Sequence, residues 1–158
     1  MSQPFWYLRA RLTYLLARRM YRWSWLVEQP RGWQWLEGQY SQMAYLGDHD
    51  AESFYGHILV FRGDGQGARD EGARLMRLAA IGGHPQAAYQ LGVMSLTGDL
   101  RNPPDALEAA QWWEMAVEAG HPLAPIKLSQ LYKLGGPGMA PDPERAIRLE
   151  GLGKPHGF

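Results

Sequence analysis

Cysteine is absent from the 158-residue sequence. The chain therefore has no disulfide bond, no thiol nucleophile and no zinc or iron–sulfur site built on cysteine. It also lacks a run of about 20 apolar residues, the length that a transmembrane helix needs. Neither sign of charge predominates, because 16 basic residues balance 16 acidic ones. This balance argues against nucleic-acid binding by the chain as a whole.

Residues with the spacing of an active site are also lacking. The five histidines show no His-x-x-x-His pair, and no serine lies in a G-x-S-x-G motif. The glycine-rich segment 63–67 has no Lys-Ser/Thr pair after it, so it is predicted as a turn rather than a phosphate loop. We expect no catalytic residue, no metal site, no cofactor and no enzymatic activity.

Charge is unevenly distributed along the chain. Residues 1–32 contain six arginines and one acidic residue, Glu28, so this segment carries +5 and the remainder carries −5. The arginines interrupt every apolar stretch, which is atypical of a secretory signal. We therefore expect the segment to be retained and the protein to be cytoplasmic.

A repeat of 36 to 37 residues organises most of the sequence. Gly83-His84-Pro85 recurs as Gly120-His121-Pro122, and an offset of 36 carries Gly83 back to Gly47. This period is typical of a helix pair. It predicts units over 47–82, 83–119 and 120–150, with helices over 85–96 and 105–119 in the middle unit. Two glycines that fall within predicted helices, Gly56 and Gly92, indicate close helix packing.

The basic, aromatic-rich segment 1–32 precedes these units. It predicts one long helix over 5–27, with Trp6, Leu12 and Leu16 on a broad apolar face, followed by a helix over 33–46. The favoured interpretation is a helix pair that caps the repeats. Docking to an anionic membrane surface and binding to a partner protein are the alternatives. The candidate residues for either surface are Arg11, Arg18, Arg19, Arg22, Trp23 and Trp25.

The repeat residues resemble the Sel1-like repeat family, which is related to the tetratricopeptide repeat. The family pattern is G-x-x-x-A-x-x-x-L-G-x-x-Y-x-x-G followed by D-x-x-x-A-x-x-W-x-x-x-A-A-x-x-G. The middle unit matches it at Gly83, Ala87, Leu91, Gly92, Gly98, Asp105, Ala109, Trp112, Ala116 and Gly120. It departs from it at Ser95, which replaces the tyrosine of the first helix.

The resemblance implies an all-α fold, a right-handed α-α superhelix (solenoid) of about three repeats over 33–150. An N-terminal capping helix pair and a flexible tail at 151–158 would complete it. It also implies a non-catalytic protein–protein interaction module, a small bacterial-type adaptor or regulator that binds a partner segment in the concave groove. By analogy, the groove residues are Asp50, Ser53, His57, Gln86, Tyr89, Val93, Gln130 and Lys133.

Two alternative functions remain open at this stage. One is a peripheral regulator on the inner face of a membrane, which would use the Arg- and Trp-rich N-terminal helix. The other is a weak nucleic-acid binder that uses the same arginines and tryptophans, which the acidic remainder of the chain disfavours.

Overall fold

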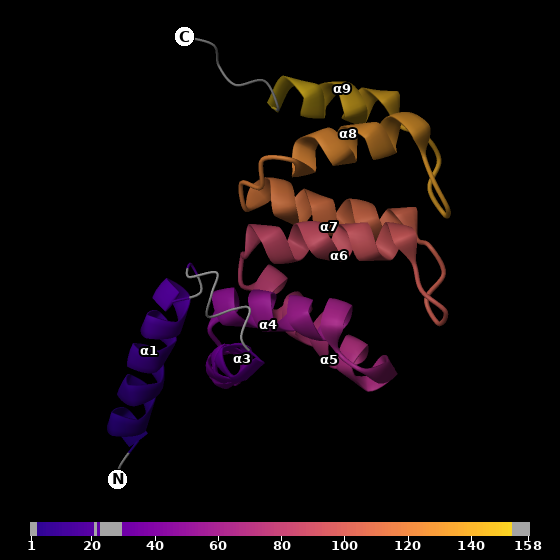
Figure 1. Cartoon of the computed structure of the whole chain (residues 1–158). Helices are drawn as coiled ribbons and strands as arrows, with labels where there is room; N and C mark the ends of the chain where they lie inside the picture. The colour runs from indigo at the N-terminus through magenta and orange to yellow at the C-terminus, as the bar shows by residue number, and fades with distance from the viewer. Residues whose placement is uncertain (1–2, 21, 23–29, 153–158) are drawn as a thin grey trace. The chain divides into compact units, whose positions relative to one another are not determined.

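The computed structural model describes residues 3–20, 22 and 30–152, and every regular element in this part of the chain is a helix (Figure 1). The predicted all-α class is therefore confirmed. The elements are α1 (Gln3–Met20), α3 (Pro30–Tyr45), α4 (His49–Arg62), α5 (Gly65–Ile81), α6 (Pro85–Thr97), α7 (Ala106–Glu118), α8 (Ala124–Leu134) and α9 (Pro143–Leu152).

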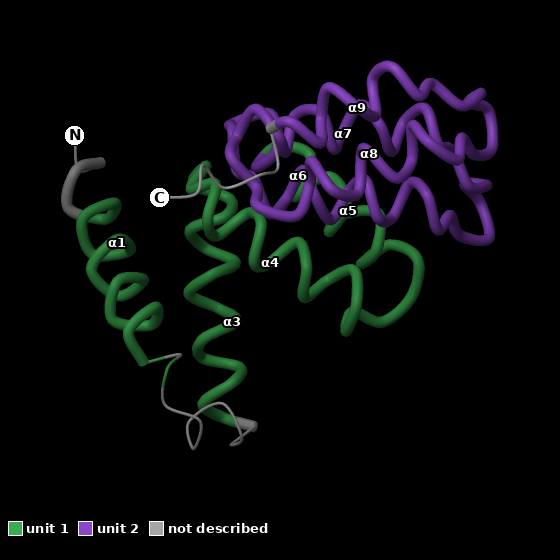
Figure 2. The backbone as a smooth tube through the Cα atoms, turned by 90° about the horizontal axis from the view of Figure 1, so that it is seen from above, with its two compact units in different colours: residues 1–78 green, residues 79–158 purple. Residues whose placement is uncertain are grey.

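The chain forms two compact units, Met1–Leu78 and Ala79–Phe158, which we call unit 1 and unit 2 (Figure 2). Each unit has its own cluster of buried side chains. The unit 1 cluster consists of Ala10, Tyr14, Tyr40, Met43, Ala44, Ala51 and Leu75. The unit 2 cluster consists of Ala106, Ala109, Ala110, Trp113, Leu128, Leu131, Tyr132 and Ala146.

The repeat is visible in the residues that begin and end the helices. Asp48 caps α4 by accepting a hydrogen bond from the Ala51 amide, and His84 caps α6 in the same way from the Ala87 amide. These two caps are 36 residues apart, and each follows a glycine with a positive φ, Gly47 and Gly83. Such caps satisfy amide groups that the first turn of a helix leaves without partners.

The two loops of unit 2 also repeat each other after 37 residues. Gly98 ends α6 and Gly135 ends α8, both with a φ of +68°, a conformation that favours glycine. Asp105 and Asp142 then cap α7 and α9 by accepting hydrogen bonds from amides three residues later. The glycine that ends one helix and the aspartate that caps the next therefore form equivalent loops in both repeats.

The glycines within the helices lie where helices approach closely, as predicted. A Cβ atom on Gly56 would lie 2.7 Å from the Gly72 carbonyl oxygen, and one on Gly92 would lie 2.4 Å from the Trp113 ring. The tryptophan that covers Gly92 is Trp113, whereas Trp112 is only partly buried. The family pattern had placed its tryptophan at Trp112.

The N-terminal predictions are corrected in two respects. The predicted helix over 5–27 is α1, described from Gln3 to Met20, and the rest of that range other than Arg22 lies outside the described residues. The expected apolar face of Trp6, Leu12 and Leu16 is exposed, because α1 packs through Ala10, Tyr14 and Ala17 instead. The small side chains of Ala10 and Ala17 allow α1 to approach its neighbours closely, and Tyr14 contacts Tyr40 of α3 edge-to-face.

The predicted helix over 33–46 and the predicted tail at 151–158 also differ from the structure in their bounds. The predicted helix over 33–46 is α3, which begins earlier, at Pro30. Gly151 and Leu152, which fall in the predicted tail, extend α9, and residues 153–158 lie outside the described part of the chain.

Candidate interaction surfaces

The first candidate surface lies on α6 in unit 2, where Gln86 is exposed and Tyr89 and Val93 are half-buried. The Tyr89 ring stacks on the His121 ring, with centroids 4.2 Å apart and planes 10° apart. The Tyr89 backbone oxygen also accepts a hydrogen bond of 3.1 Å from the Trp113 indole nitrogen. Tyr89 is therefore held in place by two neighbours, and part of its surface remains accessible.

His121 links α6 to the start of α8. Its side chain is buried, its Nδ1 atom accepts a hydrogen bond from the Leu123 amide, and its Nε2 atom lies 2.9 Å from Gln86 Oε1. Because Nδ1 acts as the acceptor, the proton of the neutral ring is on Nε2 and is donated to Gln86. Burial lowers the pKa of His121 below the usual histidine value, so the ring is neutral at pH 7.

The second set of predicted groove residues in unit 2 is on α8. Gln130 and Lys133 are exposed on this helix, and Lys133 forms an ion pair with Glu150 of α9. Ile126 shares their face, since helical residues at i, i+4 and i+7 lie together. Its side chain is 48% exposed. Ile126 was missed from the sequence, although it lies 37 residues after Tyr89 and the repeat offset identifies it.

The three predicted groove residues of α4 belong to unit 1. Asp50 forms an ion pair of 2.7 Å with Arg18, and Ser53 is buried. His57 is exposed beside Phe61, with ring centroids 4.4 Å apart, and partial burial lowers its pKa. Ser53 therefore contributes to the packing of unit 1. Asp50 is exposed but engaged by Arg18, and His57 with Phe61 is the other accessible part of this row.

A polar cluster in unit 2 joins α7, α8 and α9. The Tyr132 hydroxyl donates to Glu114 Oε1 and accepts from Arg145 Nη1, and burial raises the Tyr132 pKa. A protonated phenol held between two charges positions helices and is a poor nucleophile or base. Among the described residues, no three potential metal ligands lie together.

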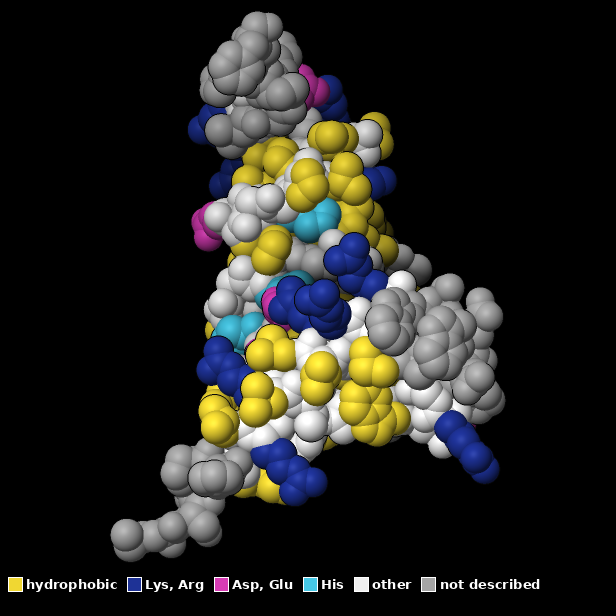
Figure 3. All heavy atoms as spheres, turned by 60° about the vertical axis from the view of Figure 1, so that its left-hand side comes forward, with side chains coloured by type: hydrophobic (Ala, Val, Ile, Leu, Met, Phe, Trp, Pro, Cys, Tyr) yellow, Lys and Arg dark blue, Asp and Glu magenta, His cyan; other side chains and the backbone are white. Residues whose placement is uncertain are grey.

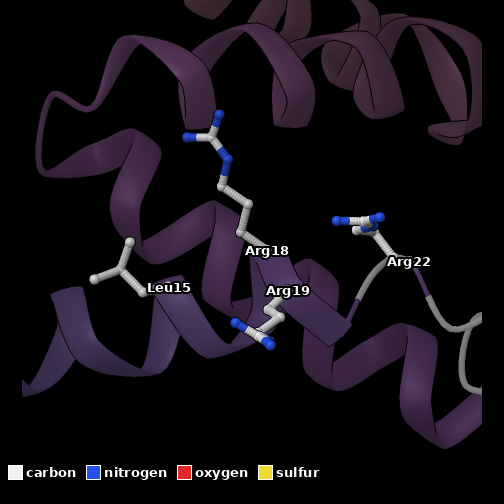
Figure 4. Close-up of a pocket in the computed structure, with 4 residues that line it drawn as sticks. All are labelled: Leu15, Arg18, Arg19 and Arg22. Carbon is white, nitrogen blue, oxygen red and sulfur yellow. The ribbon is translucent and has the colours of Figure 1, made fainter.

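The basic surface predicted in the N-terminal segment lies on α1. Arg11, Arg18 and Arg19 are exposed on this helix and Arg22 is exposed just beyond it, whereas Trp23 and Trp25 lie outside the described residues. A hollow of about 770 Å³ at the end of α1 is lined by Leu15, Arg18, Arg19 and Arg22. In Figure 4 the three guanidinium groups point in different directions rather than toward one point. The part of the chain that the structure describes has no helix long and apolar enough to cross a membrane.

Several solved structures are similar to this chain, among them two repeat proteins. A Sel1 repeat protein from Oxalobacter formigenes is 32% identical, with a TM-score of 0.58 over 70% of this chain and 81% of that protein. A protective antigen from uropathogenic Escherichia coli strains that displays an SLR fold is 23% identical, with a TM-score of 0.64 over 75% of this chain and 25% of the antigen. The second likeness concerns the fold alone. No protein-family model and no curated protein matches the chain.

Proposed function

Because the chain belongs to the Sel1 repeat family, we propose that it is a non-catalytic protein–protein interaction module. It binds a segment of a partner protein on the first helices of the repeats in unit 2, α6 and α8, and acts as an adaptor. The fold supports this proposal at the level of architecture, since stacked helix pairs present extended surfaces built from equivalent residues.

The observation that carries the proposal is the exposed row of Ile126, Gln130 and Lys133 on a helix whose other face is fixed. Leu128 and Tyr132 belong to the buried cluster of unit 2 and hold α8 in place. A row that is rigid before binding loses little conformational entropy when a partner binds. Ile126 offers apolar contact area, and the Gln130 amide offers a hydrogen-bond donor and an acceptor.

His121 makes the α6 part of this surface rigid as well. Its ring stacks on Tyr89 and its Nε2 atom binds Gln86, so two predicted groove residues are positioned by one buried side chain. A tyrosine with a fixed ring is a favourable anchor, because it adds contact area at a low entropic cost.

A matched pair of double variants tests the location of this surface. Ile126→Glu with Gln130→Glu places two charges on α8, and Leu107→Glu with Gln111→Glu places the same charges on α7 at the same spacing. All four residues are exposed, and Leu107 is 52% exposed against 48% for Ile126. A partner is first captured by a photo-crosslinking amino acid at position 126, with position 107 as the control, and is then purified.

We expect the α8 variant to weaken binding of the purified partner at least about tenfold, since a buried unpaired charge is costly at an interface. The α7 variant should bind as the unaltered protein does, measured by calorimetry. Equal binding by both variants, or cross-links at position 107 rather than 126, would contradict the proposed surface.

A further inference from the structure

The N-terminal helix α1 has two stripes of side chains with the same spacing on opposite sides. Ala10, Tyr14 and Ala17 are buried, and they follow the i, i+4, i+7 spacing of one helix face. The leucines of the other stripe begin two residues earlier, a shift of about 200° around the helix at 3.6 residues per turn. They are Leu8, Leu12, Leu15 and Leu16, between 53% and 57% exposed.

This outward leucine stripe is surrounded by arginines. Arg9 lies three residues before Leu12, on one side of the stripe, and Arg11 lies three residues after Leu8, on the other. Arg19 continues the stripe itself, four residues after Leu15. The space-filling view in Figure 3 shows apolar side chains gathered on the face that comes forward, with basic side chains around them.

The charges on α1 are all of one sign. The sequence from Gln3 to Met20 contains four arginines and no acidic residue. Arg18 is bound by Asp50 of α4, whereas Arg9, Arg11 and Arg19 form no ion pair with any described residue. Three exposed guanidinium groups therefore remain available beside the leucines.

From this arrangement we infer that α1 docks on an anionic membrane surface, lying in the interface with the leucine stripe immersed and the arginines among the lipid phosphates. Interfacial helices combine an apolar stripe with flanking basic residues in this way, and arginine side chains can extend along the apolar layer to reach the headgroups. The helix lies on the membrane rather than across it, because it is not apolar enough to span one.

Two features favour a membrane over other occupants. In a second copy of this helix arginines would face arginines, with no acidic residue on α1 to pair with them. A single free anion would need guanidinium groups that converge, whereas those of Arg18, Arg19 and Arg22 diverge (Figure 4). A surface with many phosphates suits diverging groups, and an apolar layer beneath them suits the leucines.

The packing of α1 within unit 1 makes such docking effective. Tyr14 packs edge-to-face on Tyr40 and donates a hydrogen bond to Asp48, and Arg18 is paired with Asp50. These contacts hold the small-residue face inward, so that the leucine stripe points outward. The inference does not rest on the proposed function, because the partner surface is in unit 2 and the membrane surface is in unit 1.

Vesicle flotation with the full chain tests the inference. The vesicles are phosphatidylcholine alone or an equimolar mixture of phosphatidylcholine and phosphatidylglycerol. We expect binding to the anionic vesicles at low salt, weakened at high salt, and little binding to the neutral ones. No binding to anionic vesicles at low salt would overturn the inference.

Two sets of variants separate the charges from the leucines. Arg9→Gln, Arg11→Gln and Arg19→Gln together should weaken vesicle binding by about tenfold or more, and Leu12→Gln with Leu16→Gln should weaken it to a similar degree. The controls change exposed residues of the same types elsewhere: Arg69→Gln, Arg77→Gln and Arg148→Gln together, and Leu107→Gln with Leu134→Gln. Circular dichroism checks that every variant is folded. Equal losses in variants and controls would overturn the inference.

The absence of cysteine allows one further measurement. Leu12→Cys, labelled with an environment-sensitive fluorophore, should show a blue shift on anionic vesicles, and labelled Leu107→Cys should not. A blue shift at position 107 alone would overturn the inference. So would binding to a single-stranded oligonucleotide that is as tight as vesicle binding and is insensitive to the leucine substitutions, because it would assign the arginines to nucleic acid.

Discussion

At the scale of single residues, unit 2 depends on a glycine that has no room for a side chain. Gly92 lies in the middle of α6, where glycine is normally unfavourable for a helix. The Trp113 ring occupies the space that a Cβ atom would need, at 2.4 Å. The loss of helix propensity is therefore offset by the burial of a large aromatic side chain.

We expect Gly92→Ala to lower the free energy of unfolding by about 1–3 kcal/mol, because the tryptophan must move to relieve the clash. Gly38→Ala is the matched control, since Gly38 is also within a helix but no described atom beyond its chain neighbours and the adjacent helix backbone lies within 4 Å of its Cβ position. That control should raise the free energy of unfolding by about 0.5–1 kcal/mol through helix propensity alone. Urea denaturation measures the free energy of unfolding of both variants. If neither substitution destabilises the protein, the close approach of Trp113 to Gly92 is contradicted.

His121 makes stability depend on pH. Its lowered pKa means that the folded chain binds a proton less readily than the unfolded chain does. As pH falls through the unfolded histidine value of about 6.5, the unfolded state gains protons and folding becomes less favourable. His57 acts in the same direction in unit 1.

We expect the free energy of unfolding to fall between about pH 7.5 and pH 5.5, the range in which histidine titrates. His121→Gln should reduce this slope, measured by urea denaturation at each pH, and should leave the contribution of His57. An unchanged slope in the variant would mean that His121 does not carry the effect.

At the scale of elements, equivalent positions of the repeat use different side chains for the same task. Asp48 caps α4 and His84 caps α6, in each case through the amide three residues later. A carboxylate and a neutral imidazole nitrogen both accept a hydrogen bond, so the cap tolerates the exchange.

We expect His84→Ala to lower the free energy of unfolding by about 1 kcal/mol, because the Ala87 amide loses its acceptor. His84→Asp should retain the stability at neutral pH, since unit 1 already uses an aspartate at this position and negative charge is favourable at a helix N-terminus. Thermal unfolding compares the three proteins. If His84→Asp is as unstable as His84→Ala, the loss of the cap is not the reason for the lower stability.

At the scale of the whole molecule, the two buried clusters have no residue in common. Leu128 is almost fully buried in the unit 2 cluster. In repeat proteins, stability is close to a sum of local and nearest-neighbour terms, so damage to one cluster need not spread to the other.

We expect Leu128→Ala to destabilise unit 2 by about 2–5 kcal/mol, as is usual for a buried leucine. Hydrogen exchange should then accelerate in α6–α9, while α1 and α3 of unit 1 keep most of their protection. An equal loss of protection in α1 and α3 would show that the two units unfold together.

Much of the fold could be predicted from the sequence. The repeat offset, the predicted helices over 85–96 and 105–119, and the close packing at Gly56 and Gly92 are all confirmed. These features depend on backbone preferences over a few residues, such as a proline in the first turn of a helix or a glycine after its last turn. Only part of the repeat pattern is kept, and the sequence matches no family model.

The candidate site could be predicted only in part. The groove residues were transferred by analogy from a repeat, and their role in binding stays a prediction. The repeat offset could have added Ile126, but nothing in the sequence indicates that Ser53 is buried or that Asp50 pairs with Arg18, 32 residues away. Such contacts depend on how helices meet and not on local preferences.

The sequence by itself therefore determined the helix pairs, their caps, the excess of positive charge at the N-terminus and the exclusion of cysteine chemistry. The tertiary structure decided which side of α1 is buried. Apolar residues occur all around this helix, so its periodicity allowed more than one inward face. Packing selected the face with Ala10 and Ala17, because small side chains allow close approach, and thereby left the leucine stripe on the outside.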